Sequence, residues 1–244
     1  MYVEEGLFRF KKFQVSHNQS SMKVGVDAVL LGAWAGKKAD KILEVGTGCG
    51  VISMILAQRF PSSKILAIDI DDPSVKEANM NFEASPWKDN LQAKNRRFPD
   101  DLIEIDEKYD LIVSNPPYFK SGIENPQSRR EKARHQESLS VHSLITYGIG
   151  LLTERGLLAI IFPIEFLESV IKHLRETGLT LKRVCRIRDR EEKPAKRVMI
   201  ECGRYYEGDE SYEEEVLTLF HLNDGIRTPT AAYRDLCGEL YLNF

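Results

Sequence analysis

The sequence is poor in cysteine, with four in 244 residues: Cys49, Cys185, Cys202 and Cys237. They form no C-x-x-C pair, and no histidines stand near them at the spacing of zinc ligands. A disulfide framework or a structural zinc site needs clustered residues of these types. We therefore expect reduced thiols, as in the cytoplasm, and no metal site.

A long hydrophobic run and an apolar leader are also absent. No run approaches the roughly 20 residues that span a bilayer. The start, MYVEEGLFRFKKF, has acidic residues where a secretion signal would have an apolar core. We expect a cytoplasmic protein without a membrane partner.

The sequence also lacks a large excess of charge of either sign. Lys and Arg number 34 and Asp and Glu 37, which gives a formal net charge of -3. A protein that covers nucleic acid with its whole surface is strongly basic. Any site for a polyanion must therefore be local.

What the sequence does contain is a repeated alternation of strand and helix patterns. The clearest unit is a strand over residues 41–45, a glycine loop, a helix over 51–59 and a second strand over 65–68. The right-handed crossover of such a unit implies parallel strands. The alternation continues to residue 187, and two further strands, over 195–202 and 215–221, follow without helices.

This order predicts an α/β fold with a doubly wound, mostly parallel sheet of seven strands and an antiparallel strand at one edge. The length and the lack of a low-complexity linker predict a single domain over residues 1–244, with a short amino-terminal extension over 1–38.

The glycine loop after the first strand of this unit indicates a cofactor site. Gly46, Gly48 and Gly50 let the backbone approach a ligand closely, with free N–H groups at the helix start. Their spacing is G-x-G-x-G, not the G-x-G-x-x-G of dinucleotide folds. Glu44, just before the loop, would repel a pyrophosphate and attract an ammonium group. The balance favours a cofactor with an amino-acid part.

Two further acidic residues are candidates for contacts with a nucleoside. Asp69, at the end of the second strand, can accept hydrogen bonds from two ribose hydroxyls, although NAD enzymes place an acid similarly. After the next strand, Phe98 could stack on adenine and Asp100 could accept its amino group. The alternative for residues 97–101 is a loop with no ligand role.

The tetrapeptide Asn115-Pro116-Pro117-Tyr118 follows the apolar run 109–114, where a buried parallel strand would end. Ligands bind at this edge of open α/β sheets. The Asn115 side-chain oxygen and the Pro116 carbonyl can accept both N–H bonds of one planar amino group, while Tyr118 stacks on its ring. We predict these three residues to be catalytic, with Asn115 also beside the cofactor. The alternative is a Pro-rich turn that only ends a strand.

This tetrapeptide resembles the motif of S-adenosylmethionine-dependent methyltransferases that act on amide or amino nitrogens. The run from Glu44 to Gly50, together with Asp69, is similar to the first two motifs of class I methyltransferases. The resemblance implies S-adenosyl-L-methionine as cofactor. Its methyl group is already activated, so the protein has to align nitrogen, carbon and sulfur at roughly 3–3.5 Å.

The flanking sequence resembles a narrower family. Residues 8–18, FRFKKFQVSHN, and 22–35, MKVGVDAVLLGAWA, are similar to the bacterial tRNA adenine N6-methyltransferases that modify adenine 37 of valine tRNA. The similarity continues through residues 133–135, 193–197 and 240–242. It implies transfer to an adenine of the tRNA anticodon loop, with Lys23 and Asp27 as further cofactor contacts. These two residues are four apart and share one helical face if that stretch is helical. The alternative for this pair is a salt-bridged lid without ligand contact.

Two basic runs are candidates for RNA contact. Lys11 and Lys12 stand between phenylalanines, and a second set, expected on a loop after the tetrapeptide, comprises Arg129, Arg130, Lys132 and Arg134. A splayed adenine needs phosphate contacts around its pocket. We predict that both runs form a basic rim around that pocket, although charge runs are usually solvated faces.

Other substrates stay open at this point. A glutamine amide of a protein and an amino group of ribosomal RNA are alternatives, because the tetrapeptide does not choose between them. Glutamine methyltransferases of release factors carry a helical amino-terminal domain, for which the residues before 41 leave no room. A non-catalytic RNA-binding relative is the alternative of a different class, and the intact motifs speak against it. We favour a monomer.

Overall fold

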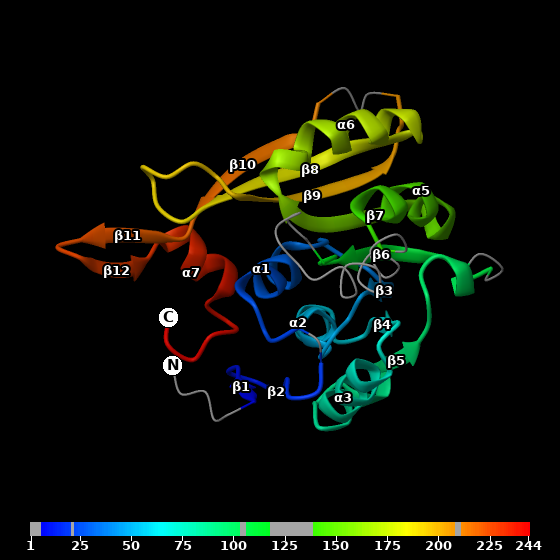
Figure 1. The fold of residues 1–244 in the computed structure, drawn as a ribbon, viewed down its shortest axis with the longest axis horizontal. Helices are drawn as coiled ribbons and strands as arrows, with labels where there is room; N and C mark the ends of the chain where they lie inside the picture. Colours follow the sequence, from blue (N-terminus) through cyan, green and yellow to red (C-terminus); the bar gives the residue numbers. More distant parts are fainter. Residues whose placement is uncertain (1–5, 21, 103–105, 118–138, 208–210) are drawn as a thin grey trace, which may run out of the picture.

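The computed structural model describes residues 6–20, 22–102, 106–117, 139–207 and 211–244. Within these residues a sheet of eight strands runs through the molecule in the order β10-β8-β9-β7-β6-β3-β4-β5 (Figure 1). In chain order the strands are β3 (Lys41–Val45), β4 (Lys64–Asp69), β5 (Leu91–Asn95), β6 (Tyr109–Ser114), β7 (Leu152–Pro163), β8 (Leu179–Arg188), β9 (Arg197–Arg204) and β10 (Glu213–Thr218).

Helices cover both faces of this sheet. One face packs against α1 (Val26–Trp34), α2 (Val51–Arg59), α3 (Asp72–Glu83) and α7 (Ala231–Cys237), and the other against α5 (Val141–Leu151) and α6 (Leu167–Glu176). Short 3-10 helices are η1 (Lys88–Asn90), η2 (Asp100–Leu102) and η3 (Ile164–Phe166). Within the described residues, none of the helices has the length and hydrophobicity to cross a membrane.

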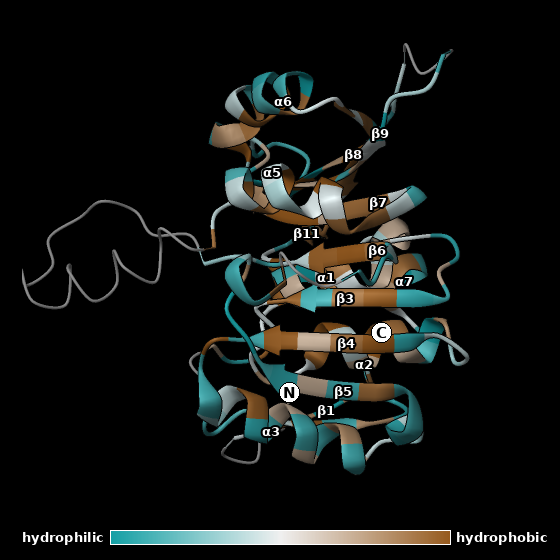
Figure 2. Ribbon diagram, turned by 90° about the vertical axis from the view of Figure 1, so that its right-hand side faces the viewer, coloured by the Kyte–Doolittle hydropathy of each residue, from teal (hydrophilic) through white to brown (hydrophobic). Residues whose placement is uncertain are grey.

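The apolar strands build two cores because successive side chains point to opposite faces of a sheet. In β6, Leu111 and Val113 belong to the core under α1 and α2, while Ile112 belongs to the core under α5 and α6. The central strands are accordingly hydrophobic along most of their length (Figure 2). The predicted doubly wound α/β fold with a mostly parallel sheet is confirmed.

Two details of the predicted sheet are wrong: the number of strands and the place of the antiparallel one. β9 is antiparallel to its neighbours, but it lies inside the sheet between β7 and β8, and the edge strand β10 is parallel to β8. The expected strand over 215–221 is split between β10 and β11 (Phe220–Asn223).

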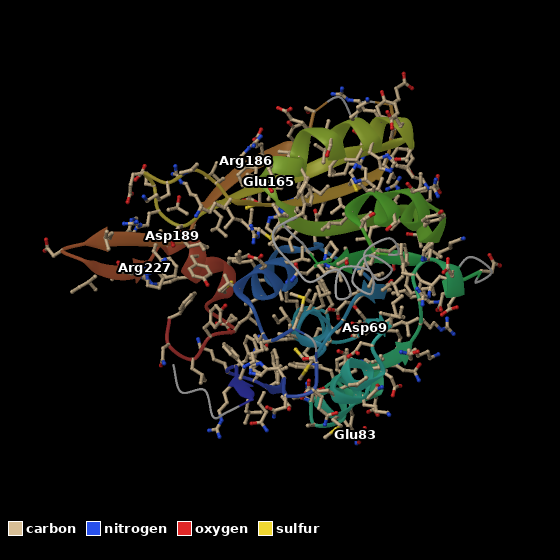
Figure 3. The ribbon with its side chains drawn as sticks, viewed as in Figure 1. Asp69, Glu83, Glu165, Arg186, Asp189 and Arg227 are labelled. Atoms are coloured by element: carbon tan, nitrogen blue, oxygen red, sulfur yellow. The ribbon has the colours of Figure 1, made fainter. Side chains whose placement is uncertain are left out.

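The first residues of β10 escaped prediction because their acidic side chains resemble a solvated loop. In the structure these acids face arginines of β8, among them Arg186 (Figure 3). Arg186 Nε lies 2.6 Å from the Glu214 carboxylate. β11 and β12 (Ile226–Pro229) form a hairpin, which an ion pair between Arg227 and Asp189 joins to the turn after β8.

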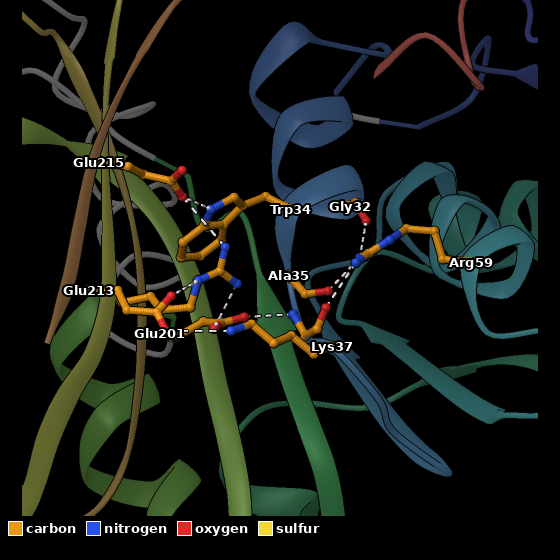
Figure 4. Close-up of polar contacts among 10 residues, drawn as sticks. Gly32, Trp34, Ala35, Lys37, Arg59, Glu201, Glu213 and Glu215 are labelled. Carbon is orange, nitrogen blue, oxygen red and sulfur yellow. Dashed lines mark hydrogen bonds and ion pairs between the residues drawn. The ribbon is translucent and has the colours of Figure 1, made fainter. Parts of the chain in front are cut away.

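The carboxyl end of α1 is held by one arginine and one glutamate (Figure 4). The Arg59 guanidinium donates to the carbonyls of Gly32, Ala35 and Gly36. The buried Glu201 accepts from the Gly36 N–H at 2.6 Å. Because a helix leaves its last carbonyls without intrahelical partners, these bonds fix where α1 ends.

Arg183 links this helix end to the edge of the sheet. Its guanidinium lies 4.3 Å from the centre of the Trp34 ring and 3.1 Å from Glu201 Oε2. The Trp34 indole N–H in turn donates to Glu215 of β10 at 2.6 Å. The amino-terminal helix and the late edge strand are therefore joined by one polar network (Figure 4).

The two ends of the described chain meet. β1 (Leu7–Arg9) and β2 (Gln14–Ser16) form a hairpin, and Phe10, just after β1, makes a bridge with Tyr241. The Lys11 N–H donates to the Leu240 carbonyl at 2.8 Å. Figure 1 accordingly draws β1 close to the segment that follows α7.

Candidate active site

A cavity of about 950 Å³ opens where β3, β4 and β6 end. This is the carboxyl edge of the sheet, where doubly wound folds bind ligands. Its walls come from the segment before α1, the glycine loop, the ends of β4 and β6, the turn after β5 and the start of β9. Among the lining residues are Met22, Lys23, Asp27, Glu44, Gly46, Gly48, Asp69, Phe98, Asn115 and Arg197.

The glycine loop lies between β3 and α2 in the predicted position. Gly50 caps α2 at φ 83, a left-handed conformation that favours glycine, and a Cβ there would lie 2.5 Å from the Phe82 ring. The N–H groups of Gly46 and Gly48 bond to the Ile68 carbonyl and to Asp69. These two loop donors are used inside the protein and are not free for a ligand.

Glu44 lies buried beneath the loop. Its Oε2 accepts hydrogen bonds from the Thr47 hydroxyl at 2.8 Å, the Ser53 N–H at 3.0 Å and the Ser53 hydroxyl. Its Oε1 is buried and has no hydrogen-bond partner among the described residues. Burial raises the pKa of Glu44 to about 7, and Asp69 adds to this effect. An unpaired carboxylate oxygen in a cavity wall suits a cationic group.

Asp69 ends β4 with its carboxylate fixed by two backbone N–H groups. The Gly48 N–H donates to Oδ2 at 2.8 Å and the Asp71 N–H to Oδ1 at 3.0 Å. Burial raises the pKa of Asp69 above its usual range. Each oxygen keeps a lone pair, so the carboxylate can accept two further hydrogen bonds from a ribose.

Asn115 follows β6 and lines the cavity. The preceding Ser114 donates its hydroxyl to the Val45 carbonyl at 2.7 Å, which ties the end of β6 to the end of β3. Asn115 Oδ1 is buried without a hydrogen-bond partner among the described residues. Pro116 is buried beside it, and Tyr118 lies outside the described residues. An unsatisfied amide oxygen in a cavity is a site for a donor from a ligand.

Lys23 and Asp27 both line the cavity but do not share a helical face. α1 begins at Val26, so Lys23 precedes the helix, and the expected pairing on one face is wrong. Asp27 instead accepts from Arg197 Nε at 2.9 Å. Arg197 begins β9 and lines the cavity too, which sequence reasoning missed because the contact spans 170 positions.

Asp100 lies outside the cavity lining. It is exposed at the start of η2, with its carboxylate 3.9 Å from Arg97 Nε. Phe98 is buried and forms part of the wall. A contact of Asp100 with adenine therefore stays a prediction that this position does not support.

The predicted RNA-binding lysines lie away from the cavity. Lys11 Nζ donates to the Gly238 carbonyl at 2.6 Å, and Lys12 Nζ lies 3.9 Å from the Glu239 carboxylate. Gln58, at the far end of α2 from the glycine loop, donates to the Glu239 carbonyl. Arg129, Arg130, Lys132 and Arg134 lie outside the described residues. The basic rim stays a prediction.

The cavity fits S-adenosylmethionine in three respects. The unpaired oxygen of Glu44 suits its ammonium group, Asp69 suits its ribose, and Phe98 offers an aromatic surface to its adenine. No cluster of three or more metal-ligating side chains is found in the part of the chain that the structure describes.

Comparison with known proteins agrees with this geometry. Residues 22–163 match the methyltransferase small domain family. The chain is 42% identical over 196 residues to the tRNA1(Val) (adenine(37)-N6)-methyltransferase of Parabacteroides distasonis, covering 80% of this chain and 82% of the relative. It is 35% identical over 238 residues to the enzyme of the same name from Vibrio vulnificus, covering 96% and 95%. The chain belongs to the family of these tRNA1(Val) (adenine(37)-N6)-methyltransferases.

Solved structures show the same fold at low identity. A predicted O-methyltransferase from Agrobacterium tumefaciens has a TM-score of 0.63 and 17% identity, covering 88% of this chain and 96% of that one. A ribosomal protein L11 methylase from Lactobacillus delbrueckii has a TM-score of 0.52 and 20% identity, covering 74% and 77%. Membership of the family makes the chain an S-adenosylmethionine-dependent methyltransferase, as predicted.

Proposed function

We propose that the protein transfers a methyl group from S-adenosylmethionine to the exocyclic N6 amino group of adenine 37 in valine tRNA. The observation that carries this proposal is the buried, unpaired Oδ1 of Asn115 in the wall of the cofactor cavity. A buried acceptor without a partner costs about 1–3 kcal/mol unless a ligand satisfies it. An amino group of the substrate would supply the missing hydrogen-bond donor. The names of the relatives support adenine as the base that carries this amino group.

The chemistry follows from the two acceptors at the end of β6. An adenine amino nitrogen is a poor nucleophile because its lone pair is delocalised into the ring. When Asn115 Oδ1 and the Pro116 carbonyl accept its two N–H bonds, they favour the pyramidal nitrogen on which positive charge grows as the N–C bond forms and the methyl carbon's bond to sulfur breaks. The sulfur keeps the electron pair of that bond, and the methylated nitrogen then loses one proton to solvent. Tyr118 is proposed to hold the ring plane by stacking, worth roughly 1–3 kcal/mol.

The remaining cavity residues hold the methyl donor. When bound, S-adenosylmethionine supplies a methyl carbon that a neutral nitrogen can attack directly. Glu44 and Asp69, which line the same cavity as Asn115, are proposed to bind its ammonium and ribose groups. Their fixed hydrogen bonds to the backbone limit the movement of both carboxylates.

The test pairs Asn115→Ala with Asn90→Ala, the same change at the opposite edge of the sheet. We expect Asn115→Ala to lower kcat on valine tRNA by roughly 10²–10³-fold, because a transition-state acceptor is lost, with the Kd for S-adenosylmethionine within about twofold. Asn90→Ala should retain the activity of the parent. An equal loss of cofactor binding and turnover in Asn115→Ala would contradict the assigned role.

The substrate is tested separately with radiolabelled S-adenosylmethionine. Valine tRNA, a transcript with guanine in place of adenine 37, ribosomal RNA and a release factor are offered in parallel. We expect label in the first RNA alone, as N6-methyladenosine at position 37. Label in the release factor or ribosomal RNA would point to the alternative substrates.

A further inference from the structure

One wall of the cavity, residues 16–20 and 22–25, has almost no regular secondary structure. Only Ser16 belongs to a strand, yet Met22, Lys23 and Gly25 line the cavity. Such a wall needs other partners to hold its shape, because an irregular segment leaves its backbone N–H groups unpaired. Those partners lie on α3, against which β2 packs (Figure 1).

Glu77 of α3 gathers the first half of the wall around one carboxylate. Its Oε1 accepts from the N–H groups of Asn18 at 2.6 Å and Gln19 at 3.1 Å and from the Ser16 hydroxyl at 3.0 Å. Its Oε2 accepts from the Ser20 N–H at 2.8 Å. Successive N–H groups that converge on one anion form a nest. This nest binds a carboxylate of the protein itself.

The charge of Glu77 survives its burial. The side chain is 2% exposed, which raises the pKa of the carboxyl, but the hydrogen bonds from Gln19, Ser20, Asn18 and Ser16 together outweigh burial and hold the pKa below its usual range. Bonds from N–H groups to an ionised acceptor are about twice as strong as neutral ones. The carboxylate is therefore a strong anchor for the wall.

Asn81, one turn further along α3, ties the same wall to the glycine loop. Its Oδ1 accepts from the Ser16 N–H at 2.9 Å, and its Nδ2 donates to the carbonyls of Ser16 at 2.8 Å and Cys49 at 2.9 Å. At the other end of the wall, the Val24 N–H donates to Nδ1 of the buried His17 at 3.2 Å. Met22 and Lys23 are thus held from both sides.

We propose that Glu77 and Asn81 are positioning residues for the cofactor, which hold the wall of residues 16–20 and 22–25 in its binding conformation before S-adenosylmethionine arrives. Preorganisation raises affinity because binding then does not have to order the wall. The proposal rests on the proposed function only in taking S-adenosylmethionine as the ligand of the cavity. Neither residue itself lines the cavity, and Asn81 reaches it only through the carbonyl of Cys49, so their effect is indirect.

The test is Glu77→Gln, which keeps the shape but removes the charge and places an amide N–H₂ against the donors of the nest. The control is Glu83→Gln, the same change on the same helix, where the carboxylate is 74% exposed. We expect the Kd for S-adenosylmethionine, measured by calorimetry without RNA, to rise roughly tenfold in Glu77→Gln, a change of about 1.4 kcal/mol, and to stay unchanged in Glu83→Gln.

Two readouts separate positioning from general stabilisation. In cofactor-free Glu77→Gln, amide hydrogen exchange should accelerate at residues 18–20 and 24 while that of β3 and β6 stays at the parent rate. The KM for S-adenosylmethionine should rise, with kcat at saturating cofactor close to that of the parent. Ser16→Ala, which removes a single hydrogen bond, should shift the Kd roughly two- to threefold in the same direction and covers the case in which Glu77→Gln fails to fold.

The proposal is overturned if folded Glu77→Gln binds S-adenosylmethionine like Glu83→Gln, or if exchange accelerates equally throughout the chain. Binding and exchange are measured without RNA. This test therefore stays valid even if the protein does not methylate tRNA. Conversely, if Glu77 and Asn81 do not position the wall, the assignment of the substrate is unaffected.

Discussion

Glu44→Gln should remove a pH dependence from the stability of the cofactor-free protein. The pKa of Glu44 is raised by burial from 4.5 to about 7. A carboxyl whose pKa is raised by folding contributes full stability below pH 4.5, and that stability is lost as the pH rises through about 7. At roughly 1.4 kcal/mol for each pH unit, the interval between these two pKa values corresponds to a loss of about 3 kcal/mol in the free energy of unfolding.

Glutamine is the informative replacement because it stays neutral at every pH and has the same shape. Its oxygen can keep the three hydrogen bonds that Oε2 accepts from Thr47 and Ser53. The assay is urea unfolding of both proteins at pH 5, 6, 7 and 8, reported as the difference in unfolding free energy. We expect the difference to move in favour of glutamine as the pH rises. A difference that is constant across this range would refute the reasoning.

The same residue predicts proton release on cofactor binding. At pH 6 a carboxyl with a pKa near 7 is about nine-tenths protonated, and an ammonium group placed beside Glu44 favours its charged form. Calorimetry in buffers of different ionisation enthalpy should therefore show close to one proton released per S-adenosylmethionine bound at pH 6. Glu44→Gln should release none from this site and should bind the cofactor more weakly.

Further perturbations test other parts of the fold. Gly50→Ala should destabilise the protein by roughly 1–3 kcal/mol and weaken cofactor binding, because the new Cβ is strained at φ 83 and would lie 2.5 Å from Phe82. Glu201→Gln should cost about 3 kcal/mol in urea unfolding by removing the buried partner of Arg183. Burial lowers the pKa of His17, so its contribution to stability is present above pH 6.5 and lost as the pH falls through the lowered pKa; His17→Asn should abolish that loss. Methylation of tRNA should slow as salt rises, while S-adenosylmethionine affinity changes little.

Matched controls sharpen these perturbations. Gly225→Ala places the same strain at φ 79 in open space, so a loss equal to that of Gly50→Ala would show that contact with the ring is not responsible. Glu213→Gln changes an exposed partner of Arg183 and should cost less than 1 kcal/mol. A tRNA rate independent of salt would contradict the basic rim.

The parts of the site that the sequence predicts are those that local pattern controls. Glu44, Asp69 and Asn115 each stand at or near the end of an apolar run, and a parallel sheet places such ends at one edge. The structure brings all three to the same cavity. The ends of strands can be predicted from the sequence because the apolar run and the polar residues that follow it are continuous in the chain.

The residues that were missed act across long distances in the sequence. Glu77 bonds to residues 57 to 61 positions away, and Arg197 reaches Asp27 across 170. In the sequence of the helix Glu77 resembles an ordinary surface acid. No local pattern indicates that its carboxylate accepts hydrogen bonds from backbone N–H groups. Lys11 shows that closeness in sequence to residues that line the cavity does not place a side chain in the cavity wall, because Lys11 Nζ instead donates to the Gly238 carbonyl.

The meeting of the chain ends has a consequence for synthesis on the ribosome. The hairpin that leads into the cofactor wall rests on Leu240 and Tyr241, which are translated some 230 residues later than Phe10. The sheet core can form as the chain emerges, but the base of that wall gains this support only when residues 240 and 241 have left the ribosome. A nascent chain that stops short of residue 240 therefore carries the methyl-transfer motif beside a cofactor wall that lacks this support.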